Sequence, residues 1–355
     1  MNNVTAPAPI DTDAVVIGAG PVGLYQVFQL GLLGARVQVI DALPRAGGQP
    51  AELYPGKPIY DLPGLLVCTG QQLTDTLLTQ IAPFKPALHF GQEAQTLRHL
   101  PDGRWEIGTR GIHAPDGWTL RARALFIAAG AGAFAPKRLK LPGIEAWEGR
   151  QLFYRPPQNA ADLPGHRVLI VGGGQAALTC AIALAESGRH AVTLAHRRAS
   201  FQADDDAVAC WHALQAEGRV RFIAGQPAGF DAEGERLTAL HIADHEGANH
   251  RVALDTVIVL QGLSPRLGPV ADWGLALERK QLAVDPEHFA TDAPGIFAVG
   301  DINTYPGKKK LLVCGFHEAT LAAWGAWPTL FPSQPAPPLL YTTSSAHLQT
   351  LLGVR

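Results

Sequence analysis

The sequence DAVVIGAGPVGLYQVFQLGLLGARVQVID, residues 13–41, decides the fold. Ala14 to Ile17 is short, apolar and rich in β-branched residues, which predicts a buried strand. A helix is expected over Leu24 to Leu33, ended by Gly34, and a second strand over Val37 to Ile40. This order of strand, glycine-rich turn, helix and strand is typical of a βαβ unit.

Three glycines stand between the first strand and the helix in G-x-G-x-x-G spacing. Gly18 allows a tight turn, Gly20 lets the backbone approach a pyrophosphate, and Gly23 lets the helix pack closely on the strand. Asp41 follows the second strand, where a carboxylate can accept hydrogen bonds from a ribose hydroxyl. The complete pattern predicts a dinucleotide site, and the alternative is a glycine-rich turn in an unrelated α/β protein.

The same pattern returns near the middle of the chain. Residues 167–177 read Arg-Val-Leu-Ile-Val-Gly-Gly-Gly-Gln-Ala-Ala, which predicts another strand, glycine turn and helix start. Gly172, Gly174 and Ala177 match the G-x-G-x-x-A variant of the motif. The chain therefore contains two candidate dinucleotide units.

The two units differ at the end of their second strand. Where the first unit has Asp41, the second has the basic triplet His196, Arg197 and Arg198. An acid there binds the ribose hydroxyls of NAD, whereas arginine suits the 2′-phosphate of NADP through charge-assisted hydrogen bonds. Opposite preferences imply two different dinucleotides, and the alternative is an arginine pair solvated on a loop.

Length, charge and cysteine usage limit the possible classes of protein. At 355 residues the chain exceeds the about 250–300 residues at which a single core stops growing, so two domains are expected. A net charge of −2 gives no global field for nucleic acid or a membrane surface. Neither a signal peptide at residues 1–9 nor a membrane-spanning run is expected. The cysteines are isolated, which predicts no metal site and fits a reducing cytosol: Cys68, Cys180, Cys210 and Cys314.

Two further stretches hold candidate ligand-binding residues. The loop from Leu43 to Lys57 is long for a simple connection, and its Gln49 and Tyr54 are candidates to line a ligand. The alternative for Tyr54 is an aromatic ring packed on its own domain. The strand expected within Gly295–Asp301 ends in Gly-Asp, and Asp301 can accept hydrogen bonds from polyol hydroxyls or act as a helix N-cap.

One dense basic run is present, Lys308-Lys309-Lys310. Such a run is commonly a solvated loop, and that is the plain interpretation here. The sharper hypothesis is a docking patch, since three adjacent cations would attract an acidic protein partner.

Two dinucleotide units, with the first domain resumed after the second, resemble the two-domain flavoprotein disulfide reductases. Within that group the chain is similar to the thioredoxin-reductase-like ferredoxin–NADP(+) reductases over nearly its whole length. Six stretches carry this resemblance, and Gly300–Lys308 is the most specific, because relatives share a closely similar Gly-Asp…Tyr-Pro-Gly-Lys run. The stretches are Gly18–Gly23, Gly47–Gln49, Leu53–Lys57, Ile59–Gly64, Gly130–Phe134 and Gly300–Lys308.

The resemblance implies an α/β fold with two Rossmann-like domains, each of three layers in the order ββα. The NADPH domain, residues 136–275, would be inserted in a discontinuous FAD domain of residues 1–131 and 285–355. Residues 132–135 and 276–284 would form the crossings between the domains. Such relatives are homodimers in which the C-terminal tail of one copy shields the flavin of the other.

The resemblance also implies which residues bind each cofactor. Tyr54 and Tyr341 would stack on the two flavin faces, although relatives carry histidine at the second of these positions. Gln202 stands where NADPH-using relatives carry an arginine. The remaining FAD contacts would be Gly18, Gly20, Gly23, Asp41, Gln49, Ala94, Phe134, Asp301, Thr342 and Thr343, with Ala94 meeting the adenine through its backbone. The NADP(H) contacts would be Gly172, Gly174, Ala177, His196, Arg197 and Arg198.

The implied activity is that of a ferredoxin– or flavodoxin–NADP(+) reductase: NADPH gives a hydride to FAD, and single electrons then pass to the carrier. A thioredoxin reductase needs a redox-active C-x-x-C pair in its NADPH domain, and this sequence has none. The alternatives are another FAD- and NADPH-dependent reductase, a monooxygenase of the same fold, or a flavin-binding redox sensor. The expected location is the cytoplasm, with no nucleic-acid or membrane partner.

Overall fold

The computed structural model describes residues 8–53, 55–112, 117–156, 163–335 and 341–354, without the side chains of residues 133–135 and 263–266. The chain divides into two compact units. Unit 1 comprises Met1–Ala133 and Arg266–Arg355, and unit 2 is Phe134–Pro265. The second unit is therefore inserted in the first.

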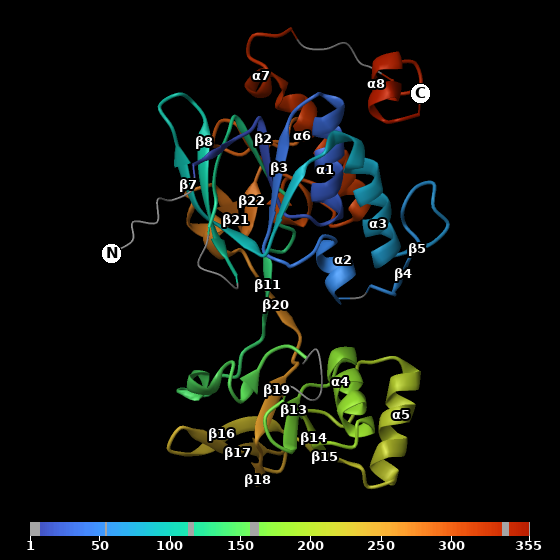
Figure 1. Cartoon of the computed structure of the whole chain (residues 1–355), viewed down its shortest axis with the longest axis vertical. Helices are drawn as coiled ribbons and strands as arrows, with labels where there is room; N and C mark the ends of the chain where they lie inside the picture. Colours follow the sequence, from blue (N-terminus) through green and yellow to red (C-terminus); the bar gives the residue numbers. More distant parts are fainter. Residues whose placement is uncertain (1–7, 54, 113–116, 157–162, 336–340, 355) are drawn as a thin grey trace. The chain divides into compact units, whose positions relative to one another are not determined.

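Unit 1 is built on a parallel five-stranded sheet in the order β23-β10-β2-β3-β6 (Figure 1). The helices α1, α3 and α6 pack on one face, and an antiparallel layer of β7, β8 and β9, with β1 added in parallel, covers the other. The bounds are β1 Ile10–Asp11, β2 Ala14–Ile17, α1 Pro21–Leu32, β3 Val37–Asp41, α3 Gly70–Ile81, β6 Ala87–Phe90, β7 Gln92–His99, β8 Trp105–Gly111, β9 Thr119–Ala122, β10 Ala124–Ile127, β23 Ile296–Ala298 and α6 Leu312–Gly325.

The alternating side chains of β2 explain the three layers. Every residue of this strand is buried, so both of its faces need a covering layer. Ala14 and Val16 belong to a core cluster shared with α1, α3 and α6, whereas Val15 and Ile17 belong to a second cluster shared with β8 and β9. A continuous apolar run of four residues thus fixes a sheet between helices and a second sheet.

Unit 2 repeats this plan with a parallel sheet β12-β19-β13-β14-β15. Val168 and Ile170 face the cluster with α4 and α5, and Leu169 and Val171 face the antiparallel β16-β17-β18 layer. The bounds are β12 Leu152–Phe153, β13 Arg167–Val171, α4 Gln175–Glu186, β14 Ala191–His196, α5 Asp205–Ala216, β15 Val220–Ala224, β16 Gln226–Glu233, β17 Arg236–Ala243, β18 Asn249–Ala253 and β19 Thr256–Val259. The predicted fold class, two Rossmann-like units of which one is inserted in the other, is confirmed.

The predicted boundary at residue 275, with a crossing at 276–284, is wrong. The second crossing is β20, Leu263–Arg266, which pairs with β11, Ala133–Pro136. Residues 266–284 belong to unit 1 because Val270 and Leu275 are buried in its core. Two short strands follow in the same unit, β21 Leu277–Glu278 and β22 Gln281–Ala283, and β22 pairs with β24, Asn303–Thr304.

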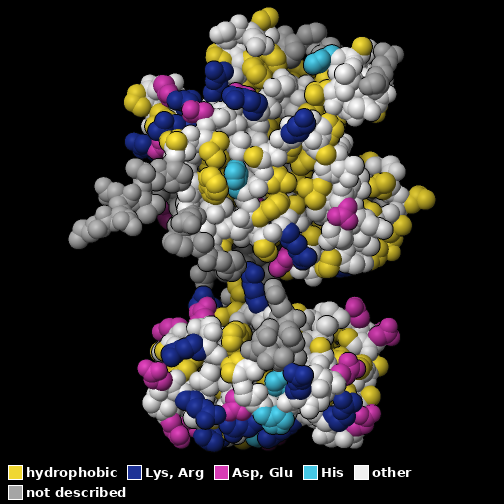
Figure 2. Space-filling model, viewed as in Figure 1, with side chains coloured by type: hydrophobic (Ala, Val, Ile, Leu, Met, Phe, Trp, Pro, Cys, Tyr) yellow, Lys and Arg dark blue, Asp and Glu magenta, His cyan; other side chains and the backbone are white. Residues whose placement is uncertain are grey.

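The remaining elements are short. They are α2 Gly48–Leu53, β4 Pro58–Ile59, β5 Cys68–Thr69, η1 Ala82–Phe84, η2 Ile144–Trp147, η4 Gly268–Asp272, η5 Gly300–Ile302, α7 Trp327–Leu330 and α8 Ala346–Leu351. Among the described residues, no helix has the length and apolarity needed to cross a bilayer. Acidic and basic side chains both occupy the visible face of each unit, in keeping with the nearly neutral composition (Figure 2).

Candidate functional site

Three predicted site residues meet at the carboxyl edge of the unit 1 sheet. Gly18 directly follows β2, Asp41 is the last residue of β3, and Asp301 lies three residues beyond β23. Because these strands run parallel in one sheet, their carboxyl ends share one edge. This is the edge at which open α/β sheets bind their ligands.

The glycine turn of unit 1 has a different requirement at each position. Gly18 has φ +107°, and a Cβ there would lie 2.4 Å from the carbonyl oxygen of Ala128. A Cβ on Gly23 would lie 1.9 Å from the carbonyl oxygen of Gly18, so α1 could not pack on the turn. A Cβ on Gly20 would meet nothing closer than the Cα of Gly48, at 3.8 Å. Packing within the protein therefore explains Gly18 and Gly23, and Gly20 leaves space that suits a ligand.

Gly20 is also the N-cap of α1. Its backbone is extended, with φ −71° and ψ 176°, and no side chain caps the helix. The first N–H groups of a helix lack intrahelical partners and carry the positive end of the helix dipole. This geometry fits a pyrophosphate, and so the residues present fit a dinucleotide such as FAD.

Asp41 holds the glycine turn as well as closing the second strand. Its Oδ2 accepts a hydrogen bond from the backbone N–H of Ala19 at 2.6 Å, and its Oδ1 accepts one from Leu43 at 2.7 Å. Burial raises the pKa of this carboxyl, and the two N–H donors oppose that rise. A carboxylate offers about four lone-pair sites, so about two remain for ribose hydroxyls.

Gln49 is brought to the same turn by the start of α2. The N–H of Gly47 donates to the carbonyl oxygen of Ala19 at 2.9 Å. A Cβ on Gly48 would lie 2.8 Å from the Cα of Gly20, so the two backbones approach closely. Gln49 follows immediately and is half-buried, which places it near the turn, and its predicted contact with a ligand stays a prediction.

Asp301 presents an unpaired carboxylate. Its side chain is half-buried and forms no hydrogen bond or ion pair with any described residue. Its backbone carbonyl, in contrast, accepts a hydrogen bond from Gln281 Nε2 at 3.0 Å. The turn is thus anchored through its backbone, and the carboxylate stays available for a ligand hydroxyl.

The basic run predicted as a docking patch is not a uniform surface. The side chain of Lys308 is only 8% exposed, and its Nζ donates to Glu318 Oε1 at 2.5 Å and to the carbonyl oxygen of Gly300 at 2.8 Å. Lys308 is therefore a buried structural cation, and the prediction that it docks a partner is wrong. Lys309 and Lys310 are exposed.

Glu318, which the sequence prediction missed, supports the turn that contains Asp301. It is fully buried on α6 and contacts the Gly300–Asp301 turn through the N–H of Gly300. One signal was available: it is the only charged residue of α6 apart from a neighbouring histidine, in the otherwise apolar run LVCGFHEATLAAWG. A carboxylate in an apolar helix is rarely buried unless it is paired.

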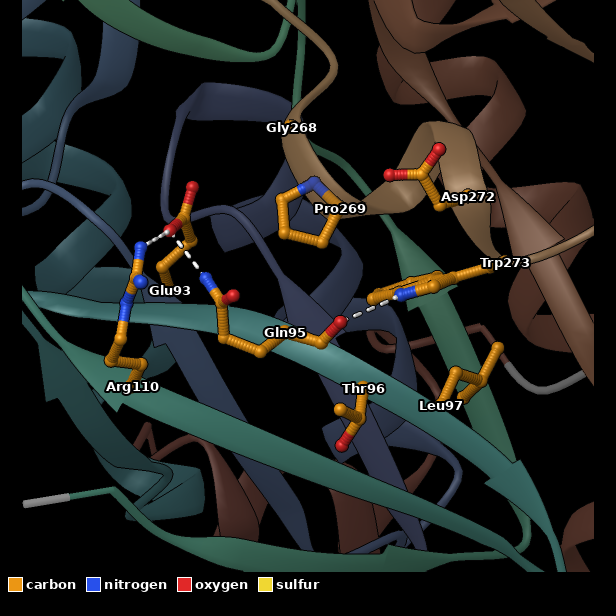
Figure 3. A pocket seen from close by; sticks show the side chains of 9 residues that line it. All are labelled: Glu93, Gln95, Thr96, Leu97, Arg110, Gly268, Pro269, Asp272 and Trp273. Atoms are coloured by element: carbon orange, nitrogen blue, oxygen red, sulfur yellow. Dashed lines mark hydrogen bonds and ion pairs between the residues drawn. The ribbon is translucent and has the colours of Figure 1, made fainter.

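A groove of about 590 Å³ lies beside the strand that contains Ala94 (Figure 3). Ala94 does not line it, because its side chain is 5% exposed and lies in the core cluster with Ile40. The carboxylate of Glu93 is engaged by Gln95 at 2.5 Å and by Arg110 at 3.2 Å. The groove contains none of the predicted site residues, and its lining is Glu93, Gln95, Thr96, Leu97, Arg110, Gly268, Pro269, Asp272 and Trp273.

The remaining residues predicted to contact FAD lie partly outside the described residues and partly near the C-terminus. Tyr54 lies outside the described residues, and so does the side chain of Phe134. The ring of Tyr341 is 70% exposed. Thr342 and Thr343 accept hydrogen bonds from Gln349 Nε2 through their backbone carbonyls, at 3.2 and 2.7 Å, which orders the start of α8.

The glycine turn of unit 2 resembles that of unit 1 in its packing, although Gly172, unlike Gly18, does not have a positive φ. A Cβ on Gly172 would lie 2.3 Å from the carbonyl oxygen of Leu260 and 3.0 Å from the Cβ of Ala177. A Cβ on Gly174, the uncapped N-cap of α4, would meet nothing closer than the carbonyl oxygen of Gln202 at 3.8 Å. The structure therefore brings Gly172, Gly174 and Ala177 together in a second turn whose geometry suits a dinucleotide.

The basic triplet lies at the carboxyl end of β14, next to this turn. A Cβ on Gly173 would lie 2.3 Å from the ring of His196, whose pKa is lowered by burial and by Arg197 and Arg198. Arg197 and Arg198 are exposed, and neither forms an ion pair with any described carboxylate. The two arginine side chains are thus available to bind an anion, whereas the His196 ring packs against the turn.

The chain is similar to known proteins in sequence and in structure. Residues 12–323 match the family model of pyridine nucleotide-disulphide oxidoreductases. Proteins named ferredoxin--NADP reductase are 50% identical in Polaromonas naphthalenivorans and 52% identical in Leptothrix cholodnii. These matches cover 98% and 97% of this chain, and 93% and 92% of the two relatives.

Solved structures show the same fold at lower identity. A thioredoxin reductase from T. acidophilum has a TM-score of 0.59 at 22% identity, over 89% of this chain and 98% of that one. The bacillithiol disulfide reductase Bdr (YpdA) from Bacillus cereus has a TM-score of 0.61 at 14% identity, over 88% and 98%. With its two glycine turns in one inserted architecture, this chain belongs to the pyridine nucleotide-disulphide oxidoreductase family.

Proposed function

We propose that this chain is a ferredoxin– or flavodoxin–NADP(+) reductase that holds FAD in unit 1 and takes NADPH in unit 2. The observation that carries the proposal is the contrast between the two turns. Asp41 lies beside one turn, and Arg197 and Arg198, which are exposed and have no carboxylate partner among the described residues, lie beside the other. The relatives that are about half identical and named ferredoxin--NADP reductase support the same activity.

In unit 1, the residues that would hold FAD each have a distinct task. The N-terminus of α1 and Gly20 receive the pyrophosphate, while Asp41 and Asp301 accept hydrogen bonds from hydroxyls. Gln49 lies at the turn, and Tyr54, Ala94 and Phe134 are assigned by resemblance. FAD, when bound, supplies hydride acceptance and single-electron donation.

A disulfide relay has no support in this chain. All four cysteines are free, and Cys68 and Cys180 are buried. Burial raises the pKa of both thiols, that of Cys180 to about 11, so neither forms a thiolate readily. The chain's electrons are therefore proposed to leave through an external carrier and not through an internal cysteine pair.

The test is an anaerobic reduction followed by a carrier assay. We expect the purified holoprotein to be yellow and NADPH to bleach its absorbance near about 450 nm. Reduction of cytochrome c should then depend on added ferredoxin or flavodoxin, and dithiol substrates should give no turnover. A colourless protein that fails to take up FAD would contradict the proposal, as would flavin reduction without carrier-dependent turnover.

Lys309 and Lys310 form the revised docking patch for the acidic carrier. Both are exposed at the start of α6, next to Leu311, which is 47% exposed. Replacing both by alanine should raise the KM for ferredoxin about 3- to 10-fold at low salt and flatten its salt dependence. Lys140→Ala, an exposed lysine of unit 2, is the matched control. An unchanged KM at low salt would leave the pair as a solvated loop.

The assembly and location are also proposals. We expect a cytoplasmic homodimer, in which Tyr341 of one copy stacks on the flavin of the other. Its 70% exposure leaves the ring available, and the unpaired cysteines suit a reducing compartment. Sedimentation analysis tests the dimer, and Tyr341→Ala should expose the flavin to oxygen, seen as faster reoxidation of the reduced enzyme in air.

A further inference from the structure

Glu318 is a completely buried carboxylate with a full set of hydrogen bonds. It is 0% exposed and accepts hydrogen bonds from four residues. Since a carboxylate has about four acceptor sites, none is left for water or a ligand. The donors are the N–H of Gly300 at 2.7 Å, Asn303 Nδ2 at 3.0 Å, Tyr305 Oη at 3.0 Å and Lys308 Nζ at 2.5 Å.

Lys308 supplies the compensating charge. Its side chain is 8% exposed, and its Nζ also lies 5.4 Å from the centre of the Tyr305 ring. Burial and the adjacent Glu318 raise the pKa of Tyr305, so its hydroxyl remains a donor. A buried ion pair of this kind is weak evidence for stability alone, because desolvation offsets much of its attraction.

The cluster grips one short segment, the turn that presents Asp301. Glu318 binds the N–H of Gly300, and Lys308 binds the carbonyl oxygen of the same residue. Gly300 has φ +79°, a conformation that side-chain-bearing residues rarely adopt. Asn303 ties the segment back to Ala298 at 2.7 Å. The backbone is therefore held on both sides of Asp301, and the carboxylate of Asp301 forms no hydrogen bond with any described residue.

We infer that Glu318, neutralised by Lys308, is a positioning residue for FAD: it fixes the Gly300–Asp301 turn so that the Asp301 carboxylate is presented to the cofactor. The inference rests on the proposed function, since it requires FAD at the carboxyl edge of the unit 1 sheet. Glu318 itself touches no ligand, and it acts through Asp301.

The test measures FAD affinity of the apoprotein and not turnover. Glu318→Gln keeps the shape of the side chain but replaces one acceptor oxygen by a donor that faces existing donors. Its FAD dissociation constant, from quenching of flavin fluorescence, should rise about 10- to 100-fold, the range seen when supporting residues of a bound metal are lost. Glu287→Gln, an 83% exposed glutamate of the same unit, should change nothing.

Two further variants keep the inference testable if Glu318→Gln does not fold. Tyr305→Phe removes one hydrogen bond but leaves the ion pair, and it should raise the dissociation constant several-fold. Lys308→Met removes the charge and should act as strongly as Glu318→Gln, with Lys140→Met as its control.

A double-mutant cycle separates positioning from a merely structural role. If Glu318 acts through Asp301, then Asp301→Asn combined with Glu318→Gln should bind FAD no more weakly than the weaker-binding single variant. Multiplied losses, or a lower melting temperature of the apoprotein with unchanged FAD affinity, would overturn the inference. If the wild-type protein bound no FAD, the proposed function would fail instead, so the two failures are distinguishable.

Discussion

The Gly20→Ala variant is expected to fold normally and to bind FAD about 10- to 100-fold more weakly, the loss expected for one charge-assisted hydrogen bond. The new Cβ would meet the nearest protein atom at 3.8 Å, an ordinary contact. At an N-cap, alanine costs at most about 1 kcal/mol relative to glycine. The methyl group would instead occupy the space into which the turn admits a pyrophosphate.

Gly23→Ala in the same turn should behave differently. Its Cβ would lie 1.9 Å from the carbonyl oxygen of Gly18, so α1 would have to move away from the sheet. We expect a loss of about 3 kcal/mol of folding free energy, near the upper end for overpacking, together with the loss of FAD.

Urea unfolding of the apoproteins and FAD titration measure the two effects separately. Gly229→Ala in unit 2, whose Cβ would have its nearest neighbour at 3.9 Å, should alter neither quantity. Gly20→Ala protein that bound FAD as tightly as wild type would show that the turn does not hold the pyrophosphate.

Replacing Arg197 and Arg198 by alanine should lower kcat/KM for NADPH about 100-fold and change that for NADH less than about 3-fold. Both guanidinium groups are exposed at the end of β14 and have no carboxylate partner among the described residues, so their charge is available to a 2′-phosphate. NADH has no such phosphate, and therefore loses no interaction.

Steady-state kinetics with both nucleotides give the measurement. Arg221→Ala, an exposed arginine on the neighbouring strand β15, is the matched control and should leave both values unchanged. Gln202→Arg should raise kcat/KM for NADPH, because it adds a cation beside the glycine turn. The backbone N–H of Gln202 is held there by a 2.8 Å hydrogen bond to the carbonyl oxygen of Gly173. Equal losses with NADPH and NADH would remove the arginines as phosphate ligands.

Local patterns were sufficient to place most of the candidate site residues at a sheet edge. The turn glycines, Asp41 and the arginine pair follow strands whose apolar runs are buried as the pattern predicts, with Ala14 to Val16 at 0% exposure. The order of a βαβ unit places such residues at one sheet edge, because parallel strands align their carboxyl ends. The Asp301 turn lies at the same edge because it follows β23, a strand of the same sheet that is more than 250 residues away from β2 in the sequence.

The sequence by itself determined the two units built on strand, glycine turn and helix, and the contrast between their turns, since both depend on short-range spacing. Only the tertiary structure decided that Lys308 is buried, that Glu318 supports the Asp301 turn, and that residues 266–275 return to unit 1. The physical reason is the same in each case. A lysine in a basic run is solvated unless it pairs with a carboxylate that is distant in the sequence. Val270 and Leu275 are apolar and could pack in the core of either unit, so only the tertiary structure shows which core contains them.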